Sequence, residues 1–318
     1  MFYLLLISAL AFIFVNGRND GAALVAIATQ TTGVRLYYPL LLLWLFLPLV
    51  PLLGVWKVAD SLRQMAGLES MALASACCVL LSTLLTVWGS GRIGIPTSIT
   101  LALVGALSGD ALARSVPLDG ALLGRTVGLG LLAPFVAALI AALISLLPFH
   151  PPRPFSANRW LKSFRATALT LLALAYAAND GQKVLFAVAL MLAAPVGTVA
   201  LNVPIMFAAS TLFIAGAIAG LPSASRFLRH GITALDPLKL LQAELATGVT
   251  VLAGSAVGTP LSMTQSITGA LLGTGLVRST RAVRWDGIAR IGVAWIWTLP
   301  AAGLLAFGAE KLVSTLSS

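Results

Sequence analysis

Two asparagine-aspartate pairs lie in parts of the chain that are otherwise apolar. Asn19-Asp20 and Asn179-Asp180 each sit in the middle of an apolar run, and each is followed by a glycine. A carboxylate at the centre of a bilayer costs about 2.5–3.5 kcal/mol on insertion scales, so it is expected to face a polar cavity with a partner. Glycine permits a helix to break, and a broken helix exposes N–H groups that suit anions and carbonyls that suit cations. The two pairs therefore predict an ion-binding site within the membrane.

Two loops rich in hydroxyl groups follow the same pattern, Gly-x-Pro-x-Ser-x-Thr, at residues 94–100 and 258–264. Glycine and proline interrupt one helix and allow another to start, so the hydroxyls fall in the first turns of the new helix. The four residues concerned are Ser98, Thr100, Ser262 and Thr264. Neutral donors at the positive end of a helix suit an oxyanion, although helix capping alone is the simpler alternative. A Gly-x-x-x-Gly spacing follows each loop, at Gly105 and Gly269, and predicts tightly packed re-entrant hairpins.

Further polar residues accompany the aspartates. Arg18 precedes the first pair, and Gln182 and Lys183 follow the second. A cation beside an aspartate either pairs with it or meets an anion, and the Gln182 amide would supply a neutral contact. Glu244 is another acid in an apolar run, without an obvious local partner. We therefore expect it, with the two aspartates, to be a candidate cation ligand.

The composition sets the class of protein. Of 318 residues, 59% are apolar and 9% are charged, whereas soluble domains carry about 25% charged residues. This balance excludes a soluble enzyme and a disordered chain, and the apolar runs do not alternate as barrel strands do. The net charge of +10 is interpreted as topology-determining loop residues rather than a nucleic-acid surface. The chain is expected to be an all-α polytopic protein of the cell membrane, with the lipid bilayer as its surroundings.

Ten membrane elements are predicted from the apolar runs, with one basic, proline-rich linker at residues 150–165 between the fifth and sixth. The elements are 2–32, 36–56, 70–91, 93–111, 121–148, 165–197, 199–221, 238–257, 258–277 and 287–309. The first, fourth, sixth and ninth are interrupted. The linker divides the chain into a first membrane repeat, residues 1–149, and a second, residues 166–318.

The two parts repeat each other. Residues 94–109 and 258–273 are identical at eight of sixteen aligned positions, and the two Asn-Asp pairs follow at nearly the same offset. Five elements in each half is an odd number, so the second half would enter the membrane inverted. With the linker in the cytoplasm, thirteen basic residues face inward and five outward, as the positive-inside rule requires. The inward group is Arg35, Arg92, Arg153, Arg159, Lys162, Arg165, Arg226, Arg229, Lys239, Arg278, Arg281, Arg284 and Arg290. We expect two inverted-topology repeats with broken helices, a scaffold typical of secondary transporters.

At these motifs the chain resembles the PiT family of inorganic phosphate transporters over nearly its whole length. The family's first signature, Gly-x-Asn-Asp, is similar to residues 17–20, and its second, Ala-Asn-Asp-x-Gln-Lys, to residues 178–183. The two hydroxyl loops, the Ala-Glu-Leu-Ala segment around Glu244 and the Trp-Ile-Trp-Thr-Leu-Pro segment at 295–300 are similar as well.

The resemblance implies a secondary active transporter, not an enzyme, that imports phosphate with Na⁺ or H⁺ by alternating access. Phosphate would lie among the Asn-Asp pairs, Gln182 and the four hydroxyls, with Asp20, Asp180 and Glu244 near cations and Arg18 and Lys183 as accessory charges. No cofactor and no metal beyond Na⁺ is expected, and a homodimer stays open.

Two other functions compete with this hypothesis. A sulfate permease of the same family is the nearer alternative, but sulfate has no proton to donate to a carboxylate near neutral pH. An intramembrane aspartyl protease is more distant. Its two aspartates would share a proton, but the Gly-x-Gly-Asp context of such enzymes is absent.

Overall fold

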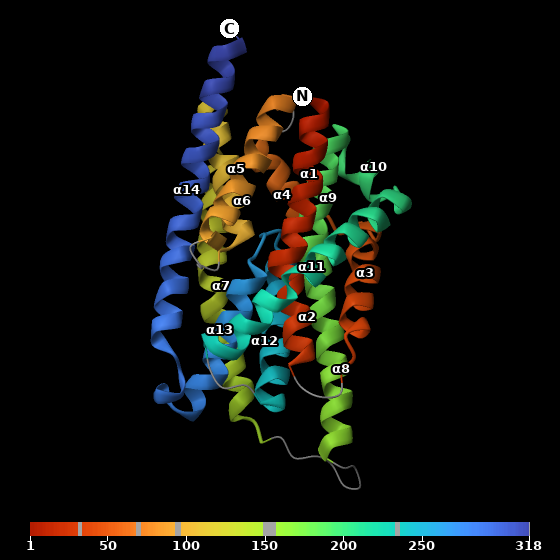
Figure 1. The fold of residues 1–318 in the computed structure, drawn as a ribbon, viewed down its shortest axis with the longest axis vertical. Coiled ribbons are helices and arrows are strands. Elements are labelled where there is room, and N and C mark those ends of the chain that lie inside the picture. The colour runs from red at the N-terminus through yellow and green to blue at the C-terminus, as the bar shows by residue number, and fades with distance from the viewer. Residues whose placement is uncertain (31–33, 68–70, 93–96, 149–156, 233–235, 318) are drawn as a thin grey trace.

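The computed structural model describes residues 1–30, 34–67, 71–92, 97–148, 157–232 and 236–317, and within them every regular element is a helix. Five helices are long and apolar enough to cross a bilayer, namely Phe2–Thr29, Leu73–Arg92, Gly120–Leu146, Val203–Leu228 and Trp285–Leu316. A sixth candidate is the pair of helices Tyr37–Leu52 and Lys57–Ala66, which are bent by 70° relative to each other. The expected all-α membrane protein with several spans is confirmed (Figure 1).

The helices follow the predicted elements closely. The first half contains α1 (Phe2–Asn16), η1 (Gly17–Gly21), α2 (Ala22–Thr29), α3 (Tyr37–Leu52), α4 (Lys57–Ala66), α5 (Leu73–Arg92), α6 (Ile99–Ala113) and α7 (Gly120–Leu146). The second half contains α8 (Ala157–Tyr176), η3 (Ala177–Gly181), α9 (Gln182–Leu192), α10 (Val196–Ala200), α11 (Val203–Gly231), α12 (Pro237–Ala256), α13 (Met263–Arg278), η4 (Thr280–Ala282) and α14 (Trp285–Ser317). The short polar helix α4 was not predicted, because its sequence is not apolar enough to form a membrane element.

Part of the predicted linker is helical. Residues 157–165 already belong to α8, and residues 150–156 lie outside the described residues. Several basic residues that were assigned to inward loops also lie in helices, among them Arg92 in α5, Arg165 in α8 and Arg226 in α11. The cytoplasmic side of the linker stays a prediction.

The Asn-Asp pairs do not lie at helix breaks. Both lie in π-helical turns, η1 and η3, and the glycines that follow them keep right-handed helical dihedrals, with φ −57° at Gly21 and φ −58° at Gly181. The expectation of free helix ends at these two places is therefore wrong. A π-turn adds one residue to a helical turn and is frequent at functional sites, so it turns the polar pair without exposing the backbone.

Gly17 and its neighbours instead permit a close helix crossing. A Cβ at Gly17 would lie 1.9 Å from the backbone oxygen of Phe213 in α11, and one at Gly220 would lie 2.1 Å from that of Arg18. Backbone contacts of this kind need residues without side chains. The crossing fixes the first π-turn against α11.

Two helical hairpins reach the middle of the molecule. In Figure 1, α5 and α6 lie in the upper half and α12 and α13 in the lower half. Helices α6 and α13 contain 15 and 16 residues, fewer than the ~20 that a bilayer span needs. The second loop turns at Gly258, whose φ is +77°. Gly94 and Pro96 of the first loop lie outside the described residues.

Each short helix packs mainly against a long helix from the other half of the chain. Helix α6 lies along α14, and α13 lies along α7. A Cβ at Gly105 would lie 2.2 Å from the Leu299 oxygen, and one at Gly269 would lie 1.9 Å from the Pro134 oxygen. The second glycine of each motif is equally close to the same long helix. The Gly-x-x-x-Gly motifs therefore join the two halves, whereas the sequence suggested that they close the hairpins on themselves.

This contact predicts a difference between two glycines of the same fold. Gly269→Ala places a methyl group against the Pro134 backbone, so we expect a loss of about 1–3 kcal/mol of stability. Gly128→Ala in α7 has nothing within 4 Å of the new Cβ and should be neutral or slightly stabilising, because alanine favours the helix. Thermal unfolding of the two purified variants in one detergent measures the difference. Equal melting temperatures would contradict the crossing.

Candidate functional site

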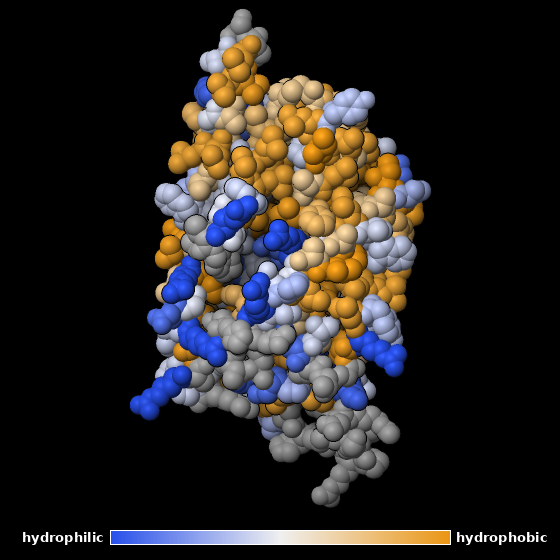
Figure 2. Space-filling model, in the orientation of Figure 1, coloured by the Kyte–Doolittle hydropathy of each residue, from blue (hydrophilic) through white to orange (hydrophobic). Residues whose placement is uncertain are grey.

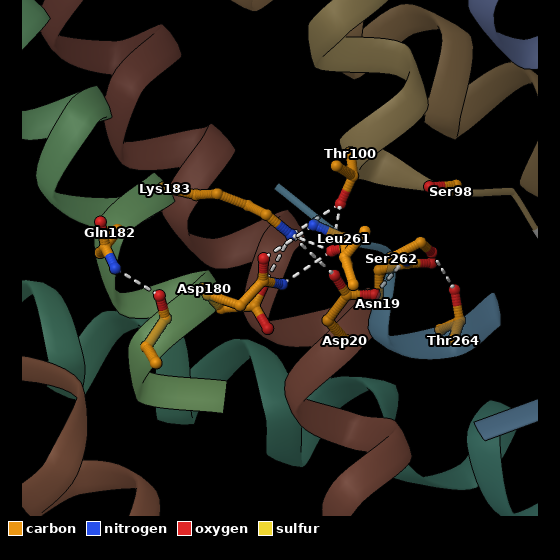
Figure 3. Close-up of polar contacts among 12 residues, drawn as sticks. Asn19, Asp20, Ser98, Thr100, Asp180, Gln182, Lys183, Leu261, Ser262 and Thr264 are labelled. Atoms are coloured by element: carbon orange, nitrogen blue, oxygen red, sulfur yellow. Dashed lines mark hydrogen bonds and ion pairs between the residues drawn. The ribbon is translucent and has the colours of Figure 1, made fainter. Parts of the chain in front are cut away.

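Lys183 lies at the centre of a buried polar cluster where the π-turns and hairpin loops meet (Figure 3). Its Nζ atom is 2.8 Å from Asp180 Oδ1 and 3.8 Å from Asp20 Oδ2. It also donates hydrogen bonds to Thr100 Oγ1 at 2.6 Å and to the Leu261 oxygen at 3.1 Å. The cluster therefore draws one residue from each of η1, η3, α9, α6 and the loop before α13.

The two asparagines of the motifs hold the two hairpin loops. Asn19 Nδ2 donates to the Thr97 oxygen at 3.3 Å and to Asp20 Oδ1 at 2.9 Å. Asn179 Nδ2 donates to the Leu261 oxygen at 2.7 Å, and Asn179 Oδ1 accepts from the Leu261 N–H at 2.9 Å. Thr97 and Leu261 occupy equivalent places in the aligned loops. Each asparagine thus ties its π-turn to the equivalent loop residue.

The four predicted hydroxyls divide into two kinds. Ser98 Oγ accepts from the Leu101 N–H, and Ser262 Oγ accepts from the Gln265 N–H, so both cap the following helix. A capping hydroxyl keeps its own proton for another acceptor. Ser262 Oγ also lies 3.1 Å from Thr264 Oγ1. Thr100 instead belongs to the lysine cluster, where its hydroxyl donates to the Leu261 oxygen.

Several buried polar atoms of this region have no hydrogen-bond partner within the described part of the chain. They include Oδ2 of both aspartates and both amide atoms of Gln265. Buried polar groups are normally paired, so these atoms are available to a ligand. Gln265 was not predicted as a site residue, although a buried amide directly after the Ser-x-Thr motif is a signal that could have suggested it.

Gln182 points away from the cluster, as Figure 3 shows. Its Oε1 accepts from the N–H groups of Val58 and Ala59 at 2.8 and 3.2 Å, and its Nε2 donates to the Ala178 oxygen. It therefore caps the N-terminus of α4, a contact between residues too distant in sequence for any local pattern to predict.

Glu244 also lies away from the two aspartates. Its Oε1 is 2.7 Å from Arg165 Nη2, and both side chains are buried. The same Arg165 nitrogen donates to the backbone oxygens of Ile27 and Ala28 near the end of α2, about 10 Å along the helix from Asp20 at 1.5 Å per residue. The sequence offered no local partner for Glu244, and the structure supplies a distant one, Arg165 of α8.

A cavity of about 760 Å³, lined by apolar residues and several polar and basic ones, lies beside the cluster. Asn19, Thr97 and Thr264 line it, together with three exposed arginines, Arg18, Arg92 and Arg226. None of its described lining residues is acidic. Figure 2 shows hydrophilic side chains around a hollow on this face, within a largely apolar surface. Arg18 therefore faces a cavity, whereas Lys183 pairs with the aspartates.

The cavity is lined at its outer part by the end of α11 and the start of α14. Both lie toward the end of the molecule where α7 ends and α8 begins (Figure 1). The three arginines therefore line a cavity that includes residues near that end of the molecule as well as Asn19 and Thr97.

Comparisons with known proteins agree with these motifs. Residues 150–306 match the phosphate transporter family. A probable low-affinity inorganic phosphate transporter of Rhizobium meliloti is 29% identical over 93% of this chain and 92% of that protein. One of Mycobacterium tuberculosis (strain ATCC 25618 / H37Rv) is 30% identical over 95% of this chain and 75% of that protein.

The fold also matches a solved structure, described as the sodium-dependent phosphate transporter. The TM-score is 0.78 and the alignment covers 99% of both chains, at 17% sequence identity. The likeness in fold extends over the whole chain, and the sequence relatives cover nearly all of it. The chain therefore belongs to the phosphate transporter family, whose members are transporters and not enzymes.

Proposed function

We propose that this protein imports inorganic phosphate as a secondary active transporter, coupled to Na⁺ or H⁺ and working by alternating access. The observation that carries the proposal is the meeting of both Asn-Asp motifs and both hairpin loops at one buried place beside a basic cavity. The names of the sequence relatives, inorganic phosphate transporters, support phosphate as the substrate.

The substrate site is assigned to the inner end of the cavity. Thr264 and Asn19 line it, and the capping hydroxyls of Ser98 and Ser262 mark the N-termini of α6 and α13. Two helix N-termini and several hydroxyls suit an oxyanion. Asp20 and Asp180 would accept a hydrogen bond from the phosphate P–OH group. Asn179 and Gln182, predicted as direct contacts, are better assigned to holding the loop and α4 in place.

Phosphate is preferred to sulfate because carboxylates repel an anion that cannot donate a hydrogen bond. Both aspartates keep one buried oxygen without a partner among the described residues, which suits a ligand that carries a proton. The protease alternative needs two carboxyls that share a proton. Here the two carboxyls also interact with each other, but one ammonium nitrogen lies within 4 Å of both and pairs with them.

Alternating access is supported by the equivalent contacts that the two halves make. Helix α6 packs on α14 as α13 packs on α7, and η1 packs on α11 as η3 packs on α3, both between the halves; within each half, α1 packs on α5 as α8 packs on α12. Equivalent contacts of this kind are expected of two inverted repeats, residues 1–149 and 166–318. Such repeats allow one set of helices to rock against the other around a fixed site. The present cavity would be the inward-open access route.

Uptake of radiolabelled phosphate into proteoliposomes tests the substrate. We expect uptake that a large excess of sulfate leaves unchanged. Asp20→Asn should reduce it at least tenfold, because the buried carboxylate is lost from the site. Asp60→Asn in α4, a partly exposed position, is the matched control and should keep uptake. Full competition by sulfate would favour the sulfate permease, and unchanged uptake by the Asp20 variant would contradict the assigned site.

The basic cavity predicts a kinetic effect. Replacing Arg18, Arg92 and Arg226 together by alanine should raise KM for phosphate several-fold, since a positive cleft concentrates anions near its mouth. The uptake rate of the variant should also depend less on ionic strength, because salt screens exposed charges. Arg125→Ala, an exposed arginine of α7, is the control and should behave as the unmodified protein. A variant with the same KM and the same salt dependence would show that the arginines do not guide the anion.

A further inference from the structure

We propose that the Lys183 ammonium occupies the place of a coupling Na⁺, so that this transporter needs no sodium ion at its central site. The inference rests on the proposed phosphate transport. Of the two coupling ions considered, it excludes Na⁺ from the central site. It follows from the atoms around one nitrogen, from the use of its three protons and from a difference between the two halves of the chain.

The oxygens around Lys183 Nζ are those that a hard cation prefers. They are two carboxylate oxygens, the Thr100 hydroxyl and the backbone oxygen of Leu261 in the extended loop before α13. Carboxylates, hydroxyls and carbonyls from unwound backbone form the sodium sites of transporters built on inverted repeats. The residues that supply these oxygens are at most 3% exposed. The oxygens around Lys183 therefore resemble a sodium site, and the lysine ammonium group occupies its centre. We call this group of four oxygens the oxygen cage.

All three protons of the ammonium group are already used. A lysine donates at most three hydrogen bonds, and Nζ donates to Asp180 Oδ1, Thr100 Oγ1 and the Leu261 oxygen at 2.8, 2.6 and 3.1 Å. The fourth oxygen, Asp20 Oδ2 at 3.8 Å, is near enough for charge attraction alone. Lys183 thus has no proton left for a phosphate oxygen. In this arrangement it pairs with the carboxylates rather than binding the anion.

The two halves of the chain differ at this position. Lys183 lies three residues after Asp180, and the equivalent residue after Asp20 is Ala23. One lysine from the second half therefore serves the aspartates of both. A metal ion could enter this cage only by displacing the Lys183 ammonium group. Because that group is covalently attached to the chain and always present, external Na⁺ competes with it poorly.

Transport by the unmodified protein in proteoliposomes is the first test. Phosphate uptake at one fixed pH gradient should be equal within about twofold in Na⁺ and in choline, with no phosphate-dependent entry of ²²Na⁺. Strict dependence on Na⁺, or ²²Na⁺ entry that follows phosphate, would overturn the inference while leaving phosphate transport intact. Absence of phosphate uptake under every gradient would instead refute the proposed function.

Lys183→Asn is the second test, because it empties the cage and adds one amide oxygen to it. We expect the variant to lose uptake in choline at least tenfold and to regain it in Na⁺. Na⁺ but not choline should also raise its melting temperature, a readout that needs no transport. Lys57→Asn is the matched control, since Lys57 is an exposed lysine that donates only to the Ala256 oxygen among the described residues. It should remain independent of Na⁺.

Each result of the second test either supports or overturns the inference. A folded Lys183→Asn variant that shows no Na⁺ response in uptake or melting would overturn the inference and indicate another role for the lysine. If that variant does not fold, Lys183→Gln is examined in the same way. If neither variant folds, the ²²Na⁺ measurement on the unmodified protein decides. Absence of phosphate-dependent ²²Na⁺ entry supports the inference, and such entry overturns it.

Discussion

The structure depends on burying ionisable side chains in the middle of an apolar molecule, where a charged group needs a partner of opposite charge. Lys183, Asp20 and Asp180 are each fully buried. Removing one partner of a buried pair leaves an uncompensated charge and costs about 3–5 kcal/mol. The surrounding elements can be understood as meeting this requirement. The π-turns bring both aspartates to the lysine, the asparagines hold the hairpin loops against it, and Leu261 supplies a backbone oxygen from a loop that is not helical.

Much of the site could be predicted because its residues are polar where their neighbours are apolar. The Asn-Asp pairs and the hydroxyl loops were found in this way, and the structure places both motifs in one region. The helix form could not be predicted, since glycine serves equally for a break and for a close crossing. Gly17 and Gly21 serve the second purpose, against α11. Whether a helix end or another helix faces a glycine depends on residues far along the chain.

The same limit explains the residues whose surroundings were unexpected. Gln182 caps α4 and Glu244 meets Arg165, and these contacts join segments that no periodicity relates. Composition does indicate that a buried acid needs a partner, but it does not indicate which cation supplies it. The sequence also treats Arg18 and Lys183 as equivalent companions of an aspartate. Only the three-dimensional arrangement separates an arginine that faces an open cavity from a lysine enclosed by oxygens.

The exchanged packing of α6 with α14 and of α7 with α13 has a consequence for biogenesis. When the first hairpin leaves the ribosome, the glycine face of α6 has no partner, because α14 follows most of the second half. An intermediate that contains only the first repeat must therefore remain open, with lipid or an insertion factor against Gly105. The two repeats therefore complete their packing together, late in assembly. In a chain that stops before α14, helix α6 would lack the long helix against which it packs.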